Sequence, residues 1–129
     1  MGITYVVDHE RRRISARGEG PLNYEEICDY ADAGRRERTA GYDELFDATG
    51  AAAELTAEQV RQLVLRIHQT PPLGSWGVTA IVATKPVVFR LARMCSILCE
   101  GVGASVAVFH TLAEAEQWLD SHPSGPRVT

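Results

Sequence analysis

The sequence has few cysteines and no long apolar segment. Its 129 residues include three cysteines, Cys28, Cys95 and Cys99. An odd number of cysteines and the lack of a signal peptide favour free thiols in a reducing cytoplasm over a disulfide framework. No segment approaches the roughly 20 apolar residues of a membrane span. We therefore expect a cytoplasmic protein without a membrane span, in which the cysteines serve as small buried apolar residues.

The chain also lacks the residue patterns of known catalytic and cofactor sites. Its histidines are scattered, at His9, His68, His110 and His122, and no Cys/His or Ser/His/Asp set follows an order known from enzymes. Gly101 and Gly103 follow a predicted helix rather than a strand, which is the wrong context for a dinucleotide-binding turn. We therefore predict a protein that is not an enzyme and that binds neither a cofactor nor a metal ion.

An excess of positive charge is absent as well. The chain carries 17 acidic and 13 basic residues, which gives a formal net charge of −4. Because neutralisation of phosphates supplies much of the affinity for nucleic acids, this charge argues against a nucleic-acid partner. The one basic cluster, Arg11-Arg12-Arg13, falls where a hairpin turn is expected. We interpret it as a solvated turn rather than as a lipid or nucleic-acid contact.

The features that are present are those of one α/β domain. Two β-rich segments, 3–8 and 13–18, are separated by a polar turn and predict an antiparallel hairpin. Gly18, Gly20 and Pro21 are then expected to end the second strand. Helix-start signals at Asn23, Thr56, Pro86 and Thr111 alternate with strand patterns at 43–48, 78–84 and 104–109.

The resulting order is β-β-α-β-α-β-α-β-α. Such alternation predicts a mostly parallel five-stranded sheet with one antiparallel edge strand and four helices on its faces. We expect a single domain over residues 1–120. Residues 121–129 contain two prolines and a glycine and are expected to form a flexible tail.

The carboxyl ends of the predicted strands offer candidates for a binding edge. Open α/β sheets usually meet ligands outside these ends. Asp47, Thr49 and Gly50 are expected to end one strand, and His110 follows the last. Asp47 has the chemistry of a general base. However, a charged strand end that faces water explains Asp43, Glu44 and Asp47 without catalysis, and we favour that interpretation.

Four sequence segments resemble those of a known superfamily. They are Ile-Thr-Tyr at 3–5, Phe-Asp-Ala-Thr-Gly at 46–50, Leu-Ala-Arg-Met at 91–94 and Glu-Ala-Glu-Gln-Trp-Leu at 114–119. Together with the element order, they resemble the SpoIIAA-like superfamily, which includes STAS domains, and are closest to the uncharacterised bacterial SpoIIAA-like proteins. The resemblance extends to Asp120. It implies a regulatory or protein-interaction module, although its motifs are structural rather than catalytic.

The resemblance also points to one modification site. Anti-sigma-factor antagonists of the STAS group carry a phosphorylatable serine in an Asp-Ser-Ser-Gly turn. In this sequence Thr56 takes the position of that serine, but the aspartate and the glycine of the motif are missing. A phosphate at a helix N-terminus is physically favourable. We nevertheless favour Thr56 as a plain helix cap.

Two kinds of binding surface are consistent with the apolar residues. Leu65, Phe89 and Ile97 fall on polar helix faces, and such residues mark a partner or self-association surface when they are contiguous. The superfamily is also similar in topology to the lipid-binding CRAL-TRIO domain, which implies an apolar small-molecule or lipid pocket between helices and sheet. The side chains expected to line it are Phe46, Trp76, Phe89 and Met94. In a domain this small we favour their use as core residues.

Overall fold

A computed structural model of the chain describes residues 2–36, 41–69, 77–101 and 105–121. These residues form five strands: β1 (Gly2–Asp8), β2 (Arg13–Leu22), β3 (Asp43–Ala53), β4 (Val78–Val82) and β5 (Ser105–Phe109). The helices in the same ranges are α1 (Tyr24–Arg36), α2 (Ala57–Gln69), α3 (Pro86–Gly101) and α4 (Leu112–Ser121). Trp76 and residues 122–129 of the expected C-terminal tail lie outside the described residues, whereas Ser121, the first residue of that predicted tail, is the last residue of α4.

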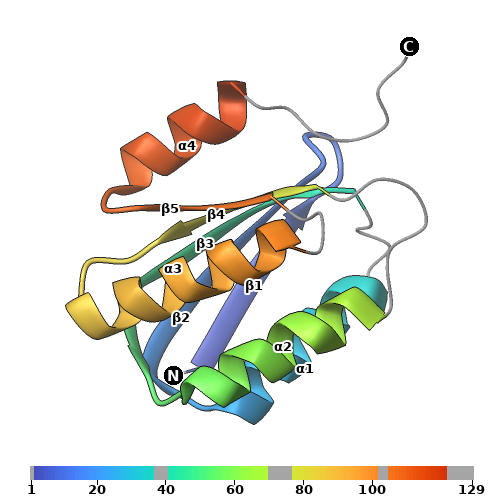
Figure 1. Cartoon of the computed structure of the whole chain (residues 1–129). Coiled ribbons are helices and arrows are strands. Elements are labelled where there is room, and N and C mark those ends of the chain that lie inside the picture. The colour runs from blue at the N-terminus through green and yellow to red at the C-terminus, as the bar shows by residue number, and fades with distance from the viewer. Residues whose placement is uncertain (1, 37–40, 70–76, 102–104, 122–129) are drawn as a thin grey trace.

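The strands lie in the sheet in their sequence order, β1-β2-β3-β4-β5. Strand β1 is antiparallel to β2, whereas β2 to β5 are parallel to their neighbours. Helices α1, α2 and α3 cover one face of the sheet, and α4 lies alone on the other (Figure 1). The predicted mostly parallel five-stranded sheet with an antiparallel edge strand and four helices is therefore confirmed.

Each face of the sheet has its own apolar core. The core beneath α1 to α3 contains Leu22, Ala48, Ala51, Ala83 and Val88. The core beneath α4 contains Leu45, Ala80, Val82, Ala115 and Leu119. Many of these residues are small, which lets the helices approach the sheet closely.

Strands β2 and β3 are longer than the sequence pattern predicts. Gly18, Gly20 and Pro21 do not end β2, which stays paired with β3 as far as Leu22 after a register shift between Arg17 and Glu19. A Cβ atom at Gly18 would lie 2.8 Å from Leu22 Cδ1, so the glycine lets the Leu22 side chain fold back onto the strand. Strand β1 pairs only as far as Glu19, so Pro21 lies on a free edge where proline is tolerated.

The hairpin turn is also less solvated than we expected. The Arg12 guanidinium lies over the Tyr42 ring, 4.8 Å from its centroid. Arg13 Nη2 donates a hydrogen bond of 3.0 Å to Asp120 Oδ1 and so ties β2 to the end of α4. Only Arg11 keeps an exposed side chain, at 61%. The interpretation of the whole cluster as a solvated turn is wrong, because two of its three arginines are held against the protein.

Replacement of Leu119 by alanine should destabilise the fold strongly. Leu119 is a residue of α4 and is fully buried against the sheet, and a large-to-small change in such a core typically lowers the free energy of unfolding by about 2–5 kcal/mol. Leu112→Ala, on the same helix but at a position 41% exposed, is the matched control and should cost less than about 1 kcal/mol. Urea denaturation measures both. Equal losses would contradict the assignment of Leu119 to the core.

Candidate functional site

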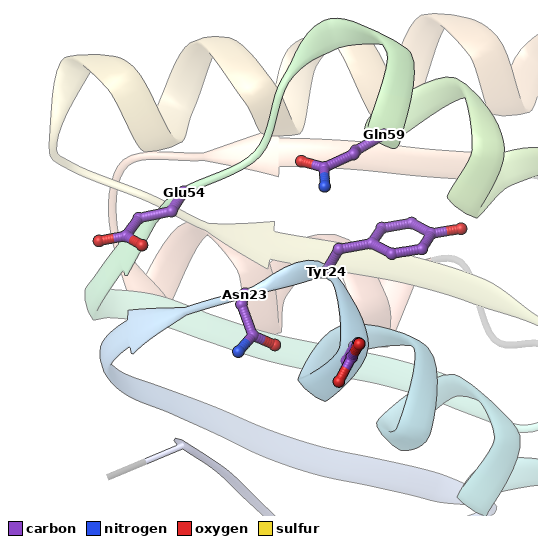
Figure 2. A pocket seen from close by; sticks show the side chains of 5 residues that line it. Asn23, Tyr24, Glu54 and Gln59 are labelled. Atoms are coloured by element: carbon purple, nitrogen blue, oxygen red, sulfur yellow. The ribbon is translucent and has the colours of Figure 1, made fainter.

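Four helices begin at one edge of the sheet, outside the carboxyl ends of β2 to β5. This is the edge at which open α/β sheets usually bind ligands. A cleft of about 300 Å³ lies here, between the starts of α1 and α2 (Figure 2). It is lined by Asn23, Tyr24, Glu25, Glu54 and Gln59.

Side-chain caps use the backbone amides around this cleft. At the start of α1, Glu26 N donates to Asn23 Oδ1 at 2.9 Å and Asn23 N donates to Glu26 Oε1 at 3.2 Å. Because the chain itself satisfies these donors, fewer of them remain for an anion. The carboxylates of Glu25 and Glu54 in the lining oppose an anionic ligand further. The cleft is therefore a polar hollow without the chemistry of a phosphate site.

Thr56, the sequence-predicted phosphorylation position, caps α2 beside the cleft. Gln59 N donates to Thr56 Oγ1 at 3.1 Å, and Thr56 N donates to Gln59 Oε1 at 3.0 Å. These two hydrogen bonds confirm the predicted capping box. Modification of Thr56 stays a prediction.

Removal of this cap should weaken the protein measurably. Thr56→Ala deletes the acceptor for Gln59 N, and loss of an N-cap typically lowers the free energy of unfolding by about 0.5–2 kcal/mol. Thr56→Ser keeps the hydroxyl and should stay close to the wild type. Thermal and urea unfolding of the three proteins check this. An alanine variant as stable as the serine variant would show that the cap contributes little.

The four candidate residues of the binding edge do not form one site. Asp47, Thr49 and Gly50 lie inside β3 rather than at its end, because β3 continues to Ala53. Asp47 Oδ1 accepts hydrogen bonds from Thr49 N at 3.0 Å and Thr49 Oγ1 at 2.7 Å. His110 is two strands away, after β5, where its ring stacks on Phe89 with centroids 4.3 Å apart. The expectation that Asp47 ends the strand is wrong, and its carboxylate is already engaged.

Glu44 forms a buried polar cluster that the sequence interpretation missed. It lies on the same face of β3 as Phe46 and so points beneath the helices. Tyr30 Oη donates a hydrogen bond to Glu44 Oε2, and Thr79 Oγ1 donates to Glu44 Oε1 at 3.1 Å. The Tyr30 ring packs edge-on against Phe46, with centroids 5.4 Å apart. The interpretation of Glu44 as a charge that faces water is therefore wrong. Asp43 is buried as well, at 4% exposed, so it does not face water either.

Burial is the main cause of the pKa shifts in this cluster. It raises the pKa of the Glu44 carboxyl above its ordinary value of 4.5, and the hydrogen bonds from Tyr30 and Thr79 offset only part of that rise. Burial also raises the pKa of the Tyr30 hydroxyl, and the nearby Glu44 carboxylate adds to the effect. Compared with an exposed carboxyl, Glu44 is thus shifted toward its neutral form.

Two thiols lie near this carboxyl on the inner face of α3. Cys95 and Cys99 are one helical turn apart, with their Sγ atoms 4.0 Å from each other. The hydrogen bond between the two thiols is the largest cause of both pKa shifts. It raises the pKa of Cys95 and lowers the pKa of Cys99. Burial and the negative charge of an ionised Glu44 act in the upward direction on both thiols, but the pKa of Cys99 still lies below its ordinary value. All three cysteines are free, as predicted, and Cys28 and Cys99 are buried.

Replacement of Glu44 by glutamine should change how stability depends on pH. Because the folded pKa of Glu44 is raised, wild-type stability should fall as pH rises from about 4.5 through the folded pKa. Glutamine cannot ionise, so the advantage of Glu44→Gln should grow over that window, by about 1.4 kcal/mol per unit of pKa shift. Urea denaturation at several pH values measures the difference. A difference that does not vary with pH would show that the carboxyl titrates normally.

An apolar groove lies between α2 and α3. It has a volume of about 140 Å³ and is lined by Arg61, Val64 and Leu65 of α2 and by Leu98 of α3. Leu65 is 46% exposed and Ile97, next to Leu98, is 60% exposed. Two of the three sequence-predicted surface residues, Leu65 and Ile97, therefore do lie on the surface. Phe89 does not, because it is half-buried and stacks on His110.

Four apolar side chains, Leu98 among them, share one side of α3. Val87, Leu91, Met94 and Leu98 follow one another at spacings of four, three and four residues, so they share one side of the helix. Val87 is 59% exposed, and the other three are half-buried. We call these four residues the α3 strip. Since Leu98 lines the groove with Leu65, the strip lies on the side of α3 that faces α2.

Two classes of site have no counterpart in the described ranges. No group of three or more His, Cys, Asp or Glu side chains there is arranged to hold a metal ion. None of the helices in those ranges has the length and apolar character that crossing a membrane requires.

Comparison with known proteins shows the fold of the chain and no more. The arrangement is similar to the crystal structure of an uncharacterized protein from the DUF3478 family with a SpoIIAA-like fold, from Shewanella loihica PV-4. The similarity has a TM-score of 0.58 and covers 92% of this chain and 94% of that one, at 15% sequence identity. No family model and no curated protein matches the sequence. The chain therefore has the SpoIIAA-like fold that its sequence motifs resemble.

Proposed function

We propose that the chain is a non-enzymatic bacterial regulatory or protein-interaction module of the STAS-like type that acts in the cytoplasm. It binds a protein partner, or a second copy of itself, through the groove between α2 and α3. One observation carries this proposal: Leu65 and Leu98, from two helices, line the same solvent-open groove. Contiguous exposed apolar surface of this kind marks association sites.

The chemistry of the other hollow supports the choice of this groove. The cleft at the starts of α1 and α2 is polar, and its helix ends are capped by the chain's own side chains. The groove instead offers leucine and valine side chains, whose removal from water favours association by roughly 25 cal/mol for each Å² of apolar surface buried. A few well-packed residues near the centre of an interface usually supply most of its affinity.

The alternative function, binding of a lipid or another apolar small molecule beneath the helices, has less support. Phe46 packs against the core beneath α1 to α3 and against the Tyr30 ring. Phe89 packs against the same core and stacks on His110. Two of the side chains expected to line a ligand pocket therefore fill space between helices and sheet themselves.

Leu65→Glu should abolish association without unfolding the protein. The carboxylate would place a charge among the apolar side chains of the groove, which should weaken binding at least tenfold, a loss of about 1.4 kcal/mol or more. Sedimentation velocity over a range of concentrations measures self-association. Affinity capture from a lysate of the source organism, compared band by band between variant and wild type, measures partner binding.

Val6→Glu is the matched control for this experiment. Val6 is 71% exposed but lies on β1, on the face of the sheet opposite α2 and α3. It should leave association unchanged, and circular dichroism should show that both variants stay folded. A wild-type protein that is monomeric at every concentration and captures no partner would refute the proposal. Equal effects of the two substitutions would refute the assignment to the groove.

A further inference from the structure

Two free thiols lie next to each other across one turn of α3. Cys95 and Cys99 are four residues apart on this helix, and their Sγ atoms are 4.0 Å from each other. Cys99 is 5% exposed, whereas Cys95 is half-buried and keeps part of its surface in contact with solvent. The packing of α3 therefore holds the pair in place, and solvent reaches it at Cys95.

The distance between the sulfur atoms is too long for a disulfide in a regular helix. A disulfide needs an S–S bond of about 2.05 Å and Cβ atoms roughly 3.5–4.5 Å apart. Residues four apart in a helix hold their Cβ atoms about 5–6 Å apart. Because a disulfide between Cys95 and Cys99 would distort α3, the helix favours the reduced pair.

The same distance suits two thiolates that bind one metal ion. A metal–thiolate bond is about 2.3 Å long, so two such bonds place their sulfur atoms about 3.8 Å apart at the tetrahedral angle and about 4.6 Å apart in a linear arrangement. The observed 4.0 Å lies between these two values and corresponds to an angle of roughly 120° at the ion. An ion between Cys95 and Cys99 would therefore fit without a change in the helix.

The number of ligands selects the kind of ion. Within the described residues, no third His, Cys, Asp or Glu side chain completes a metal-binding group with the two thiols. Zinc sites use three or four protein ligands, so this pair is too small a set for zinc. Thiolates are soft ligands that favour Cu(I), an ion that accepts low coordination numbers.

From this geometry we propose that Cys95 and Cys99 form a binding site for Cu(I) on the inner face of α3. Each thiol gives up its proton to solvent when the ion binds, and both sulfurs bond to the ion as thiolates. The hydrogen bond from Cys95 lowers the pKa of Cys99, so the ion takes the place of a proton that the two sulfurs already share. This site adds an activity to the chain that does not depend on the groove between α2 and α3.

Titration with Cu(I) under anaerobic, reducing conditions tests this site. The full chain would compete for the ion with a chromogenic Cu(I) chelator, and the wild type should take up a single ion. Cys95→Ser and Cys99→Ser should each weaken binding at least tenfold, because serine replaces a soft sulfur ligand by a hard oxygen. Cys28→Ser is the matched control, since Cys28 is also a buried free thiol but lies on α1, and it should bind like the wild type.

Two further measurements make the result specific. Circular dichroism shows whether the serine variants stay folded. X-ray absorption of the copper-loaded wild type needs no variant and should show sulfur ligands at about 2.3 Å from the ion. Failure of the wild type to compete, equal binding by all four proteins, or a coordination shell without sulfur would overturn the site.

The identity of the ion and the proposed function are tested separately. Tighter binding of Zn(II) than of Cu(I) in the same titration would overturn the assignment to Cu(I). Leu65→Glu leaves both thiols in place, so it should bind Cu(I) like the wild type even if it loses association. Loss of Cu(I) binding in this variant would show that the site is not confined to the two thiols.

Discussion

The right-handed connection between parallel strands is the constraint on which the rest of this structure depends. The strands lie in sequence order, so each crossover from β2 to β5 moves in the same direction across the sheet. Connections of one hand and one direction must all pass over the same face. Helices α1, α2 and α3 are therefore neighbours on one face, and the groove between α2 and α3 exists because of this topology. The other face is left to α4, which covers it alone.

The same constraint determines how much of the fold could be predicted from sequence. Alternation of strand and helix patterns is enough to predict the sheet, its parallel order and its single antiparallel edge, and all three are confirmed. Strand ends were less predictable. Gly18 and Gly50 suggest breaks because glycine weakens an isolated strand, yet β2 and β3 continue past them. Pairing between neighbouring strands decides where each ends, and a single segment carries no information about its neighbour.

Candidate sites were predictable only where helix spacing alone decides exposure. Leu65 and Ile97 follow from the period of their helices, and both lie on the surface. That Leu65 meets Leu98 could not be predicted, because it depends on how α2 packs beside α3. The burial of Glu44 could have been predicted. Alternation along β3 puts Glu44 on the face opposite Leu45, the same face as Phe46 two residues later. Its partner Tyr30 lies on another element, and no local pattern connects the two.

The Glu44 cluster shows how polar groups can position a helix that small apolar residues hold only loosely. The core beneath α1 to α3 is rich in alanine, and alanine side chains pack with little dependence on register. Hydrogen bonds are directional and restrict geometry much more. A carboxyl on β3 that accepts from Tyr30 of α1 and Thr79 of β4 is satisfied in one arrangement of these three elements. An unmatched carboxyl in that place would be costly, so displaced arrangements of α1 are disfavoured. Apolar burial thus supplies stability on this face of the sheet, and the Glu44 hydrogen bonds select the position of α1.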